Sequence, residues 1–296
     1  MGSGTWTTCS FANYVSDTRG LTTDAYATKS FSAQEMYTTH GLSSVLNPYM
    51  VMRECCDSEE HPETLPVILA LDVTGSMGDA SVRVAQKLND IMTELYADEN
   101  VKDIEFCIMG IGDLSCDDVP IQMSQFESDI RIAEQLDKLY FEGGGGGNKY
   151  ESYSAAWYMG VNHCDLDCWK RGKKGIIITM GDELPNPYLP KESWRSGLED
   201  VTGDSLQGDV DTKELLEEAS QKFDIYHISV KDKSTSYERY NERFHLDQNW
   251  SDLLGADHYT VATLDNLSNT IVDIVKSHVN DGAVVGMDST ANEVSW

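Results

Sequence analysis

The residues of this chain best suited to chemistry are three oxygen donors at alternate positions, Asp72, Thr74 and Ser76. They follow the apolar run 65–71, and a helical pattern begins soon after them, so the sequence predicts a buried strand, a tight loop and a helix. Open α/β sheets bind ligands at the carboxyl ends of their strands, where such a loop lies. A carboxylate and two hydroxyls that converge there are hard donors. They suit Mg²⁺, with Mn²⁺ and Ca²⁺ as alternatives.

Two further loops place an acid where strand ends are expected to gather. The glycine run 143–147 leads to Asn148 and then to Glu151, which we expect in the first turn of the helix that follows. The apolar run 175–181 predicts another main strand, and Asp182 follows it directly. Together with the first loop, Glu151 and Asp182 predict one mixed site, in which acids supply charge and hydroxyls add neutral donors.

The elements that must hold these loops alternate along the chain. Apolar runs predict strands at 66–72, 104–112, 121–126, 175–181, 223–230 and 258–262. Helical spacing of apolar residues predicts helices at 79–97, 129–140, 151–161, 211–222 and 265–279. Residues 186–210 are expected to form an irregular insertion, and residues 231–249 a polar loop with a possible helix. The alternation predicts an α/β fold with a doubly wound, mainly parallel sheet flanked by helices.

We expect the chain to have three parts. Residues 1–63 are rich in Ser, Thr, Tyr and Gly, and we expect an irregular N-terminal extension there. Its scattered aromatic residues, such as Trp6 and Phe11, would pack back onto the domain, although a partner-binding arm is the alternative. Residues 64–280 hold the α/β pattern, and residues 281–296 show no pattern, so we expect a loose tail.

The composition excludes some classes of partner. The net charge of −28 would repel nucleic-acid backbones and anionic membrane surfaces. No apolar run approaches the roughly 20 residues that a membrane-spanning helix needs. The N-terminus lacks the pattern of a signal peptide, and the seven cysteines show no disulfide framework. We therefore expect a cytoplasmic protein that binds neither nucleic acid nor membrane.

The first loop also carries a family resemblance. Residues 72–76, Asp-Val-Thr-Gly-Ser, resemble the D-x-S/T-x-S loop of von Willebrand factor A-type (vWA) domains, where it forms the first part of the metal-ion-dependent adhesion site. The alternation of strands and helices matches that Rossmann-like fold over about residues 64–280. The whole chain resembles a bacterial and phage group of vWA proteins, through segments that include 1–6, 125–127 and 145–153.

The other two loops depart from the common vWA pattern. The middle loop usually has a Thr after Gly-Gly, whereas Asn148 followed by Glu151 is similar to the integrin β-subunit variant. The third loop places its acid later than the usual Thr-Asp-Gly, and resembles a Gly-Asp-Ala-Pro form of some bacterial members. Glu183, which comes directly after Asp182, therefore competes with it for the role of ligand.

The resemblance implies a Mg²⁺-dependent protein-binding module, a scaffold or adaptor and not an enzyme. Thr74, Ser76 and Glu151 would hold the ion most directly, and Asp72 and Asp182 would hold it directly or through water. An acidic side chain of a partner protein would complete the coordination shell. Members of the wider family often work beside MoxR-type AAA+ ATPases, so such an ATPase is a candidate partner.

Three alternatives stay open at this stage. Asp79 at a helix start either favours the helix N-terminus or binds a second cation, and Asn148 and Glu183 are further candidate ligands. The first loop is also close to the Asp-Lys-Thr-Gly-Thr of haloacid-dehalogenase-type phosphatases, in which Asp72 would be the nucleophile. A second Asp two positions later is usual there, but this chain has Thr74. Finally, the metal site could be purely structural.

Overall fold

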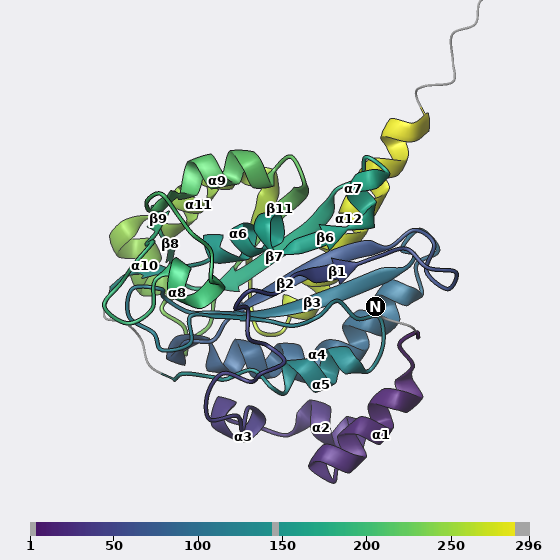
Figure 1. Ribbon diagram of the computed structural model, residues 1–296. Helices are drawn as coiled ribbons and strands as arrows, with labels where there is room; N and C mark the ends of the chain where they lie inside the picture. Colours follow the sequence, from purple (N-terminus) through teal and green to yellow (C-terminus); the bar gives the residue numbers. More distant parts are fainter. Residues whose placement is uncertain (1–3, 144–147, 288–296) are drawn as a thin grey trace, which may run out of the picture.

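The computed structural model describes residues 4–143 and 148–287, with side chains described as far as residue 280. Its centre is a six-stranded sheet with the strand order β12-β11-β7-β2-β3-β4 (Figure 1). The strands are β2 (Leu65–Asp72), β3 (Ile104–Ile111), β4 (Ile121–Met123), β7 (Gly175–Gly181), β11 (Phe223–Val230) and β12 (Tyr259–Ala262). All neighbours are parallel except β4, which runs antiparallel to β3. The predicted α/β fold with a mainly parallel sheet is confirmed.

Helices cover both faces of the sheet, so its central strands are apolar along almost their whole length. One core packs under α4 (Gly78–Tyr96), α5 (Arg131–Leu136) and α12 (Leu267–Met287). The other packs under α6 (Ser154–Asn162), α9 (Thr212–Ala219), α10 (Tyr237–Phe244) and α11 (Leu246–Leu254). This two-sided cover leaves the carboxyl ends of the strands for the loops that carry the candidate ligands.

The strand order fixes where those loops meet. In chain order the six strands lie as 6-5-4-1-2-3, so β2, the first, lies beside β7, the fourth. The chain winds away from this pair in opposite directions, and in open α/β sheets the crevice at such a switch point is where ligands bind. Asp72 ends β2 and Asp182 follows β7, so the topology brings these two predicted residues to the same crevice.

The N-terminal extension is not irregular, and that prediction is wrong. It contains α1 (Thr8–Arg19), α2 (Thr23–Thr28) and α3 (Ala33–Met36), followed by β1 (Arg53–Cys55). Thr7, Thr22 and Ser32 cap the three helices with their side chains, and Ser32 forms a capping box with Glu35. Eight aromatic or apolar side chains of this segment belong to the core under α4: Trp6, Phe11, Val15, Tyr26, Ala33, Met36, Tyr37 and Leu46.

Two other segments differ from expectation. The insertion 186–210 contains the short elements β9 (Tyr188–Leu189) and α8 (Leu198–Thr202), and β10 (Val210–Asp211) pairs with β9. Helix α12 continues to Met287, beyond the expected tail boundary. The remainder of that tail, 288–296, and the glycines 144–147 lie outside the described residues. Among the described residues, no helix combines the length and apolar character that a membrane span needs.

Candidate functional site

The first loop holds the Asp72 carboxylate by local hydrogen bonds. After β2 the chain turns through a short 3₁₀ segment, η1 (Gly75–Met77), into α4. Asp72 is fully buried, and its Oδ1 accepts hydrogen bonds from the Thr74 backbone N–H at 2.8 Å and from the Thr74 hydroxyl at 2.5 Å. Thr74 is buried, whereas Ser76 is partly exposed. The loop therefore holds one carboxylate and two hydroxyls at the carboxyl end of β2.

The middle loop places Glu151 by pairing with the third loop. Contrary to the prediction, Glu151 does not lie in the first turn of a helix, because α6 begins only at Ser154. It belongs instead to the two-residue strand β5 (Tyr150–Glu151), which pairs in parallel with β8 (Leu184–Pro185) just after β7. Its side chain is 2% exposed, and its Oε2 has no hydrogen-bond partner. Burial without a partner is costly for a carboxylate oxygen, so this position calls for a cation or a proton.

In the third loop, Asp182 accepts hydrogen bonds from two other segments with its two carboxylate oxygens. Oδ1 accepts a hydrogen bond from the Ser76 hydroxyl at 3.1 Å, and Oδ2 accepts one from the Ser236 backbone N–H. Asp182 is fully buried, and Glu183 is partly buried. The Ser76 contact joins the first and third loops directly. The structure therefore brings Asp72, Thr74, Ser76 and Asp182 into one connected group.

The electrostatics of the strand ends show an excess of buried negative charge. Burial raises the pKa of Asp72 to about 7, and the nearby Asp182 carboxylate adds to the shift. Burial, together with the charges of Asp72 and Glu183, raises the pKa of Glu151 well above its ordinary value. Burial also raises the pKa of Asp182, and raises that of Glu183 to about 8 with the help of Asp72 and Asp182. Neighbouring carboxylates thus make the ionisation of Asp72, Glu151 and Glu183 harder, an effect that a bound cation would relieve.

The three further candidate ligands, Asp79, Asn148 and Glu183, differ in their surroundings. Asp79 is exposed in the first turn of α4. Asn148 donates its side-chain N–H to Asp113, while its Oδ1 accepts from the Tyr150 backbone at 2.7 Å. The Glu183 carbonyl accepts a hydrogen bond from the Trp250 indole at 3.1 Å. Of these three, the acid of Glu183 is the one that interacts electrostatically with Asp72 and Asp182.

A buried tyrosine that the sequence reasoning missed completes the site. The Tyr153 hydroxyl donates to Asp72 Oδ2 at 2.8 Å and accepts from the Glu183 backbone N–H at 3.3 Å. Gly181 makes this possible, because a Cβ at that position would overlap the hydroxyl. Tyr153 lies two residues after Glu151, but nothing in the local sequence indicates that its hydroxyl reaches another loop.

The donor set fits a hard divalent cation. Carboxylates and hydroxyls of the first and third loops are joined by hydrogen bonds, and the Glu151 oxygen without a partner provides an unused ligand from the middle loop. Within residues 4–143 and 148–280, no three His, Cys, Asp or Glu side chains come close enough to share an ion. A cation would therefore depend on Thr74 and Ser76 as well as on the acids, and would draw Glu151 toward them.

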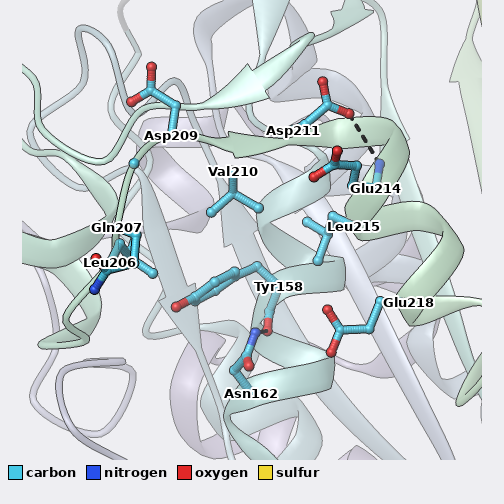
Figure 2. Close-up of a pocket in the computed structure, with 11 residues that line it drawn as sticks. Tyr158, Asn162, Leu206, Gln207, Asp209, Val210, Asp211, Glu214, Leu215 and Glu218 are labelled. Atoms are coloured by element: carbon cyan, nitrogen blue, oxygen red, sulfur yellow. Dashed lines mark hydrogen bonds between the residues drawn. The ribbon is translucent and has the colours of Figure 1, made fainter.

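A separate cavity lies away from the strand ends. It has a volume of about 370 Å³ and opens between α6, α9 and the segment 206–211 (Figure 2). Tyr158, Val210 and Leu215 supply apolar surface, and four acids also line it: Asp209, Asp211, Glu214 and Glu218. Asp211 is engaged as the N-cap of α9. None of the predicted site residues lines this cavity.

No protein-family model and no curated protein sequence matches this chain. Among solved structures, it is similar to the open conformation of the pilus adhesin SpaC from Lactobacillus rhamnosus GG, with a TM-score of 0.50 and 14% identity over 76% of this chain. The match spans 31% of the length of the adhesin chain. The likeness is therefore one of fold, to one part of a longer protein.

Two further structures give lower scores. The vWF domain of a type V pilus tip protein from Porphyromonas gingivalis has a TM-score of 0.46 and 12% identity, covering 78% of this chain and 98% of that domain. Proximal thread matrix protein 1 from the mussel byssus, with a zinc-occupied MIDAS motif, has a TM-score of 0.43 and 12% identity, covering 78% of this chain and 47% of that one.

Proposed function

We propose that this chain is a divalent-cation-dependent protein-binding module of the vWA type, with its metal-ion-dependent adhesion site at the carboxyl ends of β2 and β7. The observation that carries the proposal is the buried Glu151 Oε2, which has no hydrogen-bond partner and belongs to a carboxylate that interacts electrostatically with Asp72 and Glu183. A cation would satisfy that oxygen and neutralise the mutual repulsion of the surrounding carboxylates. The adhesin-like fold is in keeping with a binding role.

In this proposal each loop supplies one kind of donor. Thr74 and Ser76 hold the ion with their hydroxyls, and Glu151 adds a carboxylate oxygen. Asp72 and Asp182 act directly or through water, because both already accept hydrogen bonds from the chain. Mg²⁺ is the ion we favour, since such oxygen donors suit it. An acidic side chain of a partner protein takes the remaining position, and an AAA+ ATPase in the cytoplasm is a candidate for that partner.

We propose binding in preference to catalysis because of the surroundings of Asp72. A phosphatase of the haloacid-dehalogenase type needs the aspartate as an attacking nucleophile. Here the carboxylate is fully buried and accepts three hydrogen bonds, two from Thr74 and one from Tyr153. A nucleophile held in this way would first have to break these contacts, whereas a ligand that acts through water would not.

The test is metal titration followed by partner capture. Isothermal titration of the metal-free chain with Mg²⁺ and Mn²⁺ should show binding, and Asp72→Ala should weaken it by about a hundredfold or more, since second-shell changes alone cost about 10- to 100-fold. Asp200→Ala removes an exposed acid in α8 and should leave binding unchanged. Circular dichroism confirms that the variants fold.

Capture of a partner by the wild-type chain should then be lost with EDTA and with Asp72→Ala. If Asp72→Ala keeps both metal and partner binding, the proposal is wrong. If chelation lowers the melting temperature but leaves capture intact, the metal is structural. Phosphatase turnover that disappears in Asp72→Asn would favour the enzymatic alternative.

A further inference from the structure

Helix α10 lies at the edge of the proposed site and brings basic side chains to it. The helix begins directly after Ser236, whose backbone N–H donates to Asp182. The Tyr240 hydroxyl donates to the Asn148 carbonyl at 3.2 Å, so the same helix also contacts the middle loop. Burial raises the pKa of Asp182, and the positive charge of Arg239 acts in the opposite direction. Arg239 is therefore within electrostatic range of the third loop.

Lys149, Arg239 and Arg243 form a cluster that we call the basic rim. Each of the three lies over an aromatic ring of α10. Lys149 Nζ lies 4.3 Å from the ring centre of Phe244, and the guanidinium carbon of Arg243 lies 5.6 Å from the same ring centre. The guanidinium carbon of Arg239 lies 4.6 Å from the ring centre of Tyr240. The rings hold these cations by cation–π attraction, which does not use their N–H donors.

The basic rim has no acidic partner of its own. Among the side chains that the structure describes, none of its three cations forms a salt bridge, although Asp and Glu outnumber Lys and Arg by 50 to 22. Elsewhere cations find acids, as Lys174 does with Asp224 at 3.0 Å. Of the acids of α10, Glu238 pairs with Lys231 at 2.6 Å, and Glu242 is exposed. The rim therefore keeps charge and donors for an acid from outside the described chain.

We propose that the basic rim binds acidic residues next to the partner's metal-binding acid, so that the partner presents a run of acids and not a single one. This inference rests on the proposed function and names the kind of segment that its site accepts. The ion takes one carboxylate, and the rim takes its neighbours through charge-assisted hydrogen bonds. The net charge of −28 repels such a segment elsewhere on the surface, so the rim also directs its approach.

The experiment uses two peptides of equal length, each with a neutral fluorophore. One has a single Glu in a Gly-Ser sequence, and the other, the acid-rich peptide, has a run of Glu. Fluorescence anisotropy gives the Kd of each peptide with Mg²⁺ and with EDTA. The rim variant is Arg239→Gln with Arg243→Gln, both exposed in α10. The matched control removes the same charge from exposed positions elsewhere, by Lys138→Gln after α5 and Lys213→Gln in α9.

With Mg²⁺, the wild type should bind the acid-rich peptide more tightly than the single-Glu peptide. The rim variant should bind the acid-rich peptide about tenfold more weakly, since each exposed ion pair contributes about threefold, and should bind the single-Glu peptide nearly as the wild type does. The control should leave both Kd values unchanged, because at about 0.15 M salt charges more than about 8 Å apart are screened. Isothermal titration should show that the rim variant still binds Mg²⁺, and circular dichroism that it is folded.

Equal Kd values of the rim variant and the control for the acid-rich peptide overturn this inference and leave the proposed function standing. A wild type that binds the two peptides equally well overturns it in the same way, and so does a wild type that binds Mg²⁺ but neither peptide. Binding of the acid-rich peptide that persists in EDTA and in Asp72→Ala, but is lost in the rim variant, overturns the proposed function instead, because the rim would then bind acids without the ion.

Discussion

Two buried glutamates, one near each end of the sheet, have a carboxylate oxygen without a hydrogen-bond partner. Glu105 is the second residue of β3 and lies at the amino end of the strands, whereas Glu151 lies at the carboxyl end. Their side chains are 1% and 2% exposed, and both have an Oε2 without a partner. By burial and hydrogen bonding alone, the two positions look alike.

Glu105 and Glu151 differ in the charged groups that surround them. Burial raises the pKa of Glu105 to about 6 and Glu127 adds to the shift, while a hydrogen bond from Cys55 and the nearby His61 act to lower it. At Glu151 the neighbours that contribute are Asp72, Glu183, Asp117 and Asp113, and each adds to the effect of burial in raising the pKa. A buried acid without a partner therefore does not by itself indicate a metal site. A group of buried acids that raise one another's pKa values does indicate a candidate functional site.

The largest expected effect is a difference in the response to Mg²⁺. At about 100 times its Kd, Mg²⁺ should raise the unfolding free energy of the wild type and of Glu105→Gln by about 2.7 kcal/mol. Glu151→Gln should lose most of this gain. Its stability without Mg²⁺ should not fall, because Gln imitates the neutral form that burial favours. Urea unfolding with Mg²⁺ or EDTA measures these differences, and an equal gain in both variants would remove the distinction between the two ends.

The second effect is the part of the pH dependence that Glu105 contributes at the amino end, which the comparison of wild type with Glu105→Gln isolates. The folded-state pKa of Glu105, about 6, lies above the ordinary 4.5, so its contribution to stability is present at low pH and is lost as pH rises through about 6. From about pH 5 to about pH 7.5 the wild type should lose about 1 kcal/mol more than Glu105→Gln. Urea unfolding across this range in EDTA tests it. Identical pH profiles would mean that Glu105 ionises in the folded chain as easily as in water.

The smallest effect distinguishes the two roles considered for Asp79, stabilising the helix N-terminus or binding a second cation. Because Asp79 is exposed and lies in the first turn of α4, we expect it to act on the helix dipole. Asp79→Asn should then cost about 0.5 kcal/mol of stability and leave the Mg²⁺ titration unchanged. A loss of binding stoichiometry in the titration would instead show a second cation near α4.

Much of the fold could be predicted because its signals are local. The apolar runs that form β2, β3, β7 and β11 have few polar interruptions, and the cap at Asp211 marks the start of α9. The N-terminal helices were missed because they are short and contain few apolar residues. Their capping residues, such as Ser32 with Glu35, are the local signal in the sequence that marks these helices.

The site was predicted in part, and what was missed depends on contacts between loops. The spacing of Asp72, Thr74 and Ser76 shows that they share one loop. Nothing near Glu151 shows that it pairs with β8 about thirty residues later, so the expected helix start was wrong. Tyr153 was missed for the same reason, because its importance depends on the space left by Gly181 in another strand.

The N-terminal helices have a mechanical consequence for the site. Tyr37, directly after α3, donates a hydrogen bond from its hydroxyl to the Ser81 carbonyl at 2.7 Å. The Ser81 hydroxyl in turn donates to the Asp72 carbonyl at 3.3 Å. A tensile force on α3 would therefore reach the backbone of Asp72, the first candidate ligand, through two hydrogen bonds and the first turn of α4. The N-terminal segment, expected to be irregular, is therefore linked mechanically to the strand-end site through these hydrogen bonds.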